Sequence, residues 1–299
     1  MIEDPSTTTT WPNMSPDDGD YYTLDEAYRF AQTILWSAFF GIIFNWALFA
    51  CLCIQMWFYA TRFKKENVAP IRYIVWSLFI IECFSTGYLT WSTYVQIVKN
   101  WGHDPTYNPS AFGMLFFDCS ITSIVHGLYV WRIYSLFTKE SSSPRTRHQM
   151  YGFVLLISAL SLCQFSCCVA TAFFEALQYH QGPGKQFVAR KLFHAWLASA
   201  SIADIIITVV LVCKLSSIRI RLGVKATDDK IKKILYTIVP AGAATAICQI
   251  LIWVLQGTFP GVAYYQFLIF SLSKIYSNSV ILSLNLRDNK QQQISVDFN

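Results

Sequence analysis

The sequence predicts an all-α integral membrane protein, a bundle of seven transmembrane helices with its N-terminus outside and its C-terminus in the cytoplasm. Three observations lead to this prediction. Of the 299 residues, 54% are hydrophobic and only 14% are charged, whereas a soluble domain is about 25% charged. Seven long apolar stretches follow a polar N-terminal segment, and lysine and arginine are unevenly distributed between them. With lipid as the solvent for much of the surface, so many apolar side chains need no large internal core.

The composition divides the chain into three parts. Residues 1–28 are polar, threonine-rich and acidic, and they lack the basic start and apolar centre of a signal peptide. We expect them to form an extracellular or lumenal tail, in which Asn13 begins an Asn-Met-Ser glycosylation sequon. Residues 29–287 form the predicted seven-helix membrane domain, and residues 288–299 form a short cytoplasmic tail.

Each apolar stretch is long enough to cross a bilayer core, which takes about 20 residues in a helix. Within lipid each stretch should be helical, because every backbone N–H and C=O must find its partner inside the segment. The short connections hold the prolines and glycines that end helices. The predicted spans are Ile34–Tyr59, Ile71–Val98, Ala111–Phe137, Tyr151–Leu177, Leu192–Cys213, Ile234–Leu255 and Val262–Leu284.

The basic residues predict the orientation, because cytoplasmic loops of membrane proteins are enriched in lysine and arginine. One side of the predicted bundle carries seventeen of the 23 basic residues, and the other side carries five. Seven of the seventeen lie in one loop, from Lys214 to Lys233. The excess places that side in the cytoplasm and places Asn13 on the side where glycosylation occurs. We expect the plasma membrane as the location, although any membrane of the secretory pathway fits the same pattern.

Ionisable side chains within the spans are the candidate site residues, because each costs roughly 2.5–3.5 kcal/mol to insert into lipid. Glu82, Asp204 and Lys274 lie near the middle of the second, fifth and seventh spans. One interpretation is a polar cavity in which Lys274 has Glu82 or Asp204 as its counter-ion. The other interpretation is a structural ion pair that locks the helices together, because buried pairs also occur without any chemistry.

Five further residues in or near the spans carry expectations of their own. Asp118 and Glu175, in the outer thirds of the third and fourth spans, are expected to line an outer, water-filled mouth. His126 is more typical of an interhelical hydrogen bond than of a ligand. Arg132 is expected to extend to lipid phosphates, with partner docking as the alternative. Pro240 interrupts the sixth span just before small residues that let a neighbouring helix approach closely.

Several chemistries find no support in the sequence. The nine cysteines all lie in apolar runs, which argues against a disulfide scaffold, and no spacing of cysteine and histidine indicates a metal site. A net charge of +5 without a basic stripe indicates no nucleic acid as a partner. No nucleophile and base stand in a pattern that indicates an enzyme, and no cofactor is expected. A retinal Schiff base at Lys274 is disfavoured, because Phe270 stands where microbial rhodopsins usually carry an acid.

Motifs in the later spans carry a family resemblance. Span seven contains Ser273-Lys274-Ile275-Tyr276-Ser277-Asn278-Ser279, then Leu284-Asn285-Leu286-Arg287, and span five contains Ala203-Asp204-Ile205. These motifs resemble a large family of basidiomycete fungal seven-helix membrane proteins with a C-terminal domain of unknown function. Glu82, where that family often has Asp, and Pro240 are departures. The resemblance implies a seven-helix membrane fold and no established substrate. The family's motif positions include four of the candidate site residues, Asp204, Lys274, Tyr276 and Asn278.

Together these features predict a receptor-like membrane sensor of unidentified ligand, with a cytoplasmic partner at the loop from Lys214 to Lys233. Attraction to lipid headgroups explains the basic loop equally well. One alternative is an ion- or proton-coupled transporter or channel built on Glu82, Asp204 and Lys274. The other is a non-catalytic structural membrane protein. The lipid bilayer is the partner that composition itself indicates.

Overall fold

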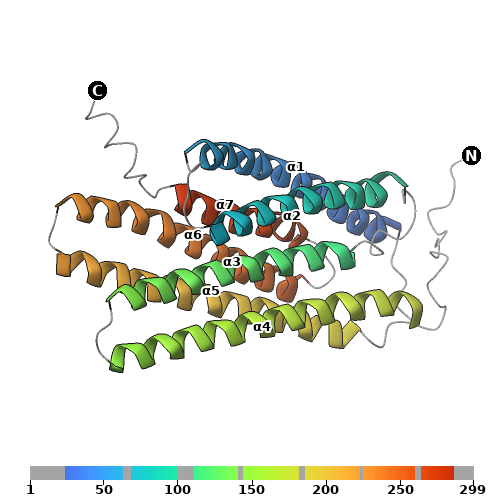
Figure 1. Ribbon diagram of the computed structural model, residues 1–299. Coiled ribbons are helices and arrows are strands. Elements are labelled where there is room, and N and C mark those ends of the chain that lie inside the picture. Colours follow the sequence, from blue (N-terminus) through green and yellow to red (C-terminus); the bar gives the residue numbers. More distant parts are fainter. Residues whose placement is uncertain are drawn as a thin grey trace, which may run out of the picture.

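The computed structural model describes residues 24–62, 69–99, 111–140, 144–181, 186–222, 225–259 and 264–285, and over these residues the chain is almost entirely helical. The elements are α1 (Leu24–Arg62), α2 (Ala69–Tyr94), the π-helical turn η1 (Val95–Lys99), α3 (Ala111–Glu140), α4 (Pro144–Gln181), α5 (Gln186–Leu222), α6 (Lys225–Thr258) and α7 (Gln266–Asn285). Figure 1 shows the helices running alongside one another in an elongated bundle. The predicted all-α architecture is confirmed.

Six of the helices contain stretches long and apolar enough to cross a membrane. These stretches are Leu35–Arg62, Ile71–Lys99, Gly113–Thr138, Arg147–Phe174, Val188–Ser217 and Gln266–Asn285. In α6 the described side chains form a shorter apolar segment, Gly242–Thr258. The predicted sixth span begins at Ile234, among side chains outside the described residues. The protein is therefore a multi-pass helical membrane protein.

The outer surface of the bundle is apolar. Leu155 and Tyr73 are 72% exposed and Trp57 is 70% exposed, and many other large apolar side chains also point outward. In water, each fully exposed side chain of this size would forgo about 1.5–3 kcal/mol of burial free energy. Against lipid tails the same surface costs little, so the exposure agrees with a bilayer environment.

Helix α7 is the inner helix of the bundle. Twelve of its 20 residues are buried, and it packs against α1, α2, α3 and α6. Figure 1 shows it (red) among its neighbours rather than at an edge. Its polar side chains therefore face other helices, and each needs a partner inside the protein.

Helices α1 and α7 run parallel, joined by side-chain amides that bond the backbone of the other helix. The bonds are Asn45 Nδ2 to the Phe270 carbonyl (2.5 Å), Asn278 Nδ2 to the Leu48 carbonyl (3.1 Å) and Asn285 Nδ2 to the Gln55 carbonyl (2.9 Å). The partners advance along both helices in the same direction. Gly41 lets this contact close, because a Cβ there would lie 2.8 Å from an atom of the Phe270 ring.

The small residues after Pro240 permit the close approach that the sequence predicts. A Cβ on Gly242 would overlap Thr208 Oγ1 of α5. Helix α6 continues through Pro240 from Lys225 to Thr258. The glycine therefore matters at the α5–α6 interface, where a larger residue would push the two helices apart.

Some predictions fall on residues outside the described ranges. These include Asn13, residues 1–23, residues 288–299 and most side chains between Lys214 and Lys233. The predicted loop from Lys214 to Lys233 is wrong for the backbone, because α5 continues to Leu222 and α6 begins at Lys225. The backbone of Glu175 lies in α4, but its side chain is also outside the described residues. Helix α1 begins at Leu24, five residues before the predicted start of the membrane domain.

Candidate functional site

The first buried cluster joins α7 to α2. Lys274 Nζ donates a hydrogen bond to Glu82 Oε2, and both side chains are fully buried. Ser277, nearly one turn further along α7, donates from its hydroxyl to Glu82 Oε1 at 2.5 Å. Both carboxylate oxygens of Glu82 therefore have partners. Of the two counter-ions that the sequence left open for Lys274, the structure pairs it with Glu82.

Asp118 of α3 adds a second acid to this cluster. Its side chain interacts with the hydroxyl of Ser273, and it lies close enough to Lys274 for attraction and to Glu82 for repulsion. Asp118 is 7% exposed. The expectation of an open, water-filled mouth at Asp118 does not match this position, which is interior. We call Glu82, Asp118, Ser273, Lys274 and Ser277 the lysine cluster.

The second buried cluster is centred on Asp204 of α5. His126 Nε2 of α3 lies 3.0 Å from Asp204 Oδ1. The hydroxyl of Tyr276 donates to Asp204 Oδ2 at 2.5 Å, and Gln249 Nε2 of α6 donates to the same hydroxyl. All four residues are less than 5% exposed. Asp204 thus links α5 to α3 through His126 and to α7 through Tyr276. The Tyr276 hydroxyl in turn links α7 to α6 through Gln249.

The far side of His126 extends this cluster to α4. His126 Nδ1 lies 3.2 Å from Ser161 Oγ and 3.4 Å from Gln164 Nε2. This arrangement agrees with the interpretation of His126 as an interhelical hydrogen-bonding residue. We call His126, Ser161, Gln164, Asp204, Gln249 and Tyr276 the aspartate cluster.

Two further side chains bind α7 to its neighbours outside these clusters. Asn278 Nδ2 also bonds the Lys274 carbonyl at 2.7 Å, which fixes the amide that reaches α1. Near the C-terminal end of α7, Arg132 Nη1 of α3 donates to Ser283 Oγ at 3.2 Å. Arg132 was expected to extend to lipid phosphates, and the structure instead gives it a partner within the bundle.

Sequence reasoning missed Ser277, Gln164 and Gln249. Serine is common in apolar helices, where it usually bonds its own backbone, so Ser277 carried no signal. A glutamine inside an apolar run is a stronger signal, because its amide must be satisfied within the protein. Charge drew attention to the acids and the lysine, while the neutral residues that complete their hydrogen bonds went unnoticed.

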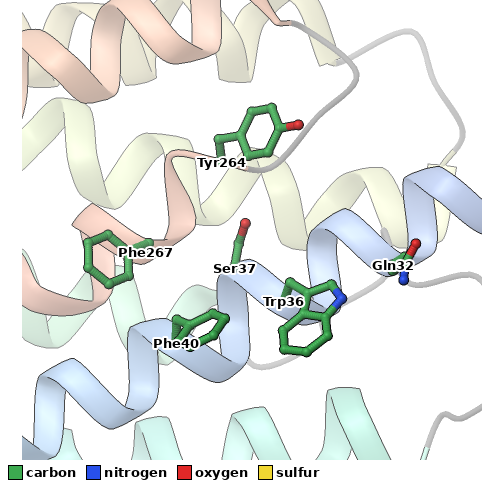
Figure 2. A pocket seen from close by; sticks show the side chains of 6 residues that line it. All are labelled: Gln32, Trp36, Ser37, Phe40, Tyr264 and Phe267. Carbon is green, nitrogen blue, oxygen red and sulfur yellow. The ribbon is translucent and has the colours of Figure 1, made fainter.

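A surface hollow lies at the end of the bundle where α1 and α7 begin. It has a volume of about 590 Å³ and is lined by Gln32, Trp36, Ser37, Phe40, Tyr264 and Phe267. Figure 2 shows Gln32, Trp36, Ser37 and Phe40 along one stretch of α1, with Phe267 at the start of α7 and Tyr264 just before it. The rings of Trp36 and Phe40 stack at 5.5 Å. We call this hollow the aromatic groove.

The chemistry open to the two clusters is exchange of protons and of hydrogen-bond partners. The lysine cluster brings two carboxylates and an ammonium together, and the aspartate cluster brings a carboxylate, an imidazole and a phenol together. Among the described residues, no group of three or more His, Cys, Asp or Glu side chains could hold a metal ion. A rearrangement in either cluster would change which helices α7 is bonded to.

Residues 200–289 match the model of a family of unknown function, DUF6534. The matched segment contains Asp204, Gln249, Lys274 and Tyr276, whereas Glu82 and His126 lie outside it. No curated protein and no solved structure matches the chain. From within α5 to just beyond α7, the chain is thus similar to a domain whose function is unknown.

Proposed function

We propose that the protein is a receptor-like membrane sensor of seven spans, with the N-terminus outside and the C-terminus in the cytoplasm of the plasma membrane. The observation that carries the proposal is the set of contacts made by α7. This one helix lines the aromatic groove at its start, joins both buried clusters at mid-length and bonds Arg132 near its end. A small movement of α7 would therefore change contacts at both ends of the bundle.

The lining of the aromatic groove indicates which class of ligand could bind there. Four aromatic rings supply an apolar surface, and the amide of Gln32, the hydroxyl of Ser37 and the phenol of Tyr264 supply polar groups. Such a lining suits an amphipathic molecule, with an apolar body against the rings and a polar end at the amide and hydroxyls. The groove also lies at the start of the α1 span, so a ligand could enter from the lipid as well as from water.

The distribution of positive charge supports a partner-binding surface on the cytoplasmic side. With seventeen of 23 basic residues on one side, that side is the cytoplasmic side, and the basic segment from Lys214 to Lys233, at the end of α5 and the start of α6, is the surface offered to a partner. Lys214, near the end of α5, places its ammonium 3.8 Å from the ring centre of Phe137 of α3. The basic segment thus contacts the helix that carries His126 and Arg132.

The test is mass spectrometry of the protein purified gently from its native membranes into lipid nanodiscs. We expect a stoichiometric amphipathic molecule in the wild type that is depleted in Trp36→Ala. The matched control is Trp253→Ala, because Trp253 is 50% exposed on α6, outside the groove. The same small-molecule content in all three proteins would contradict the sensor and favour a structural role.

A transporter or channel is the second candidate, favoured by the ionisable side chains that lie together at mid-length in four helices. Proton or ion flux into liposomes is the measurement, with Lys274→Met as the variant. Flux that disappears in the variant would support transport. Absence of flux under proton, sodium and potassium gradients would count against it.

A further inference from the structure

The lysine cluster holds more acid than base. Glu82 of α2 and Asp118 of α3 both lie close to one ammonium, that of Lys274 of α7. Glu82 and Lys274 are fully buried, and Asp118 is 7% exposed. Helices α2, α4, α5 and α7 pack against α3, and among their described residues the charges that act on Asp118 are those of Glu82 and Lys274. If all three groups were ionised, the cluster would carry one negative charge that no cation balances.

The hydrogen bonds show which carboxylate the ammonium serves. Lys274 donates to one oxygen of Glu82, and Ser277 donates to the other. Asp118 interacts with the Ser273 hydroxyl, and the ammonium acts on it through attraction at longer range. The negative charge without a counter-ion therefore falls on Asp118.

One bound proton is enough to balance this charge. An ionised carboxyl without a counter-ion is costly at membrane depth, and two carboxylates at one site do not readily ionise together. Asp118 lies seven residues after the start of α3, which is about 10 Å along a helix. The distance that a proton must cross from that end of the bundle is therefore short.

We propose that the lysine cluster is a proton-binding site, in which Asp118 takes up one proton from water and releases it to water. With the proton bound, the ammonium of Lys274 serves Glu82 and ties α7 to α2. With the proton released, Asp118 repels Glu82 and competes with it for the ammonium, so that α3 also attracts α7. The proposal does not rest on the sensor, because a proton site could serve in a receptor, a transporter or a structural protein.

The test is infrared spectroscopy of the full-length protein in lipid nanodiscs at about pH 6, where an aspartate in water is ionised. A protonated carboxyl has a carbonyl band that is separate from the bands of carboxylates. We expect this band in the wild type, and we expect it to disappear at alkaline pH. Labelling the carboxyl groups of aspartate with carbon-13 should shift it. A wild type without the band, or a band that the label does not shift, would overturn the proposal without any variant.

Three variants locate the proton. Asp118→Asn should abolish the labelled band, whereas Asp118→Glu, which keeps the carboxyl, should show a band that the aspartate label no longer shifts. Glu82→Gln should also abolish the band, because Asp118 then becomes the counter-ion of Lys274 and ionises. A labelled band that survives in Asp118→Asn or in Asp118→Glu would belong to another aspartate. A labelled band that survives in Glu82→Gln would show that the lack of a counter-ion is not what holds the proton. Either result would overturn the proposal.

Discussion

Removing Lys274 alone should cost more stability than removing both members of the buried ion pair. Lys274 and Glu82 are each fully buried, and breaking such a pair on one side typically costs about 3–5 kcal/mol. Lys274→Met should lie at the upper end of this range, because Glu82 and Asp118 would then repel each other without a cation between them. Glu82→Gln should lie at the lower end, because Asp118 would still attract the ammonium.

The double variant Glu82→Gln/Lys274→Met should recover part of the loss. The repulsion between Glu82 and Asp118 is then gone, and the amide oxygen introduced by Glu82→Gln can still accept the hydrogen bond from Ser277. Asp118 is left without the ammonium, so we expect the double variant to be about 1–2 kcal/mol more stable than Lys274→Met and less stable than the wild type.

Reversible unfolding in mixed micelles titrated with sodium dodecyl sulfate measures these differences. Lys99→Met is the control, because Lys99 is exposed at the end of η1 and should change stability by less than about 0.5 kcal/mol. A loss below about 1 kcal/mol in Lys274→Met would refute the reasoning. So would a double variant as unstable as the sum of the two single variants.

Three further predictions concern packing, hydrogen bonding and orientation. Gly242→Ala should destabilise the protein by about 1–3 kcal/mol in the same unfolding assay, because the new methyl group overlaps a threonine hydroxyl of α5. Gly152→Ala, with no atom near the added group, should instead be neutral or gain up to about 1 kcal/mol of helix propensity. Tyr276→Phe should cost about 1–3 kcal/mol by removing a donor to buried Asp204, whereas Tyr73→Phe, at a 72% exposed site, should change little. Asn13→Gln should abolish a glycan-sized mass shift seen in the wild type, and a wild type without that shift would argue against an outside N-terminus.

The architecture was predictable because lipid leaves a chain few choices. A long apolar stretch in a bilayer must be helical, so the elements followed from hydropathy alone. The ionisable residues Glu82, Asp204 and Lys274 were also readable, since charge within an apolar run stands out. Their arrangement was not, because the pairing depends on how each helix is rotated about its own axis.

The position of Asp118 shows this limit most clearly. The place of Asp118 in the outer third of the third span predicted a water-filled opening. The rotation of α3 about its axis instead turns the Asp118 side chain toward Ser273 and the lysine cluster. The aromatic groove was equally hidden. Trp36 and Phe40 lie in an apolar stretch with many other aromatic residues. Only the packing of α1 beside the start of α7 brings Tyr264 and Phe267 next to them.

The central claim is that α7 carries a signal from the aromatic groove through the lysine cluster to the cytoplasmic side. Hydrogen–deuterium exchange of the basic segment from Lys214 to Lys233 tests it most directly, with and without the amphipathic molecule that we expect to co-purify with the protein. Addition of the molecule should change exchange in the wild type. In Glu82→Gln/Lys274→Met, the molecule should still bind but the basic segment should no longer respond. An unchanged response in the double variant would contradict the claim.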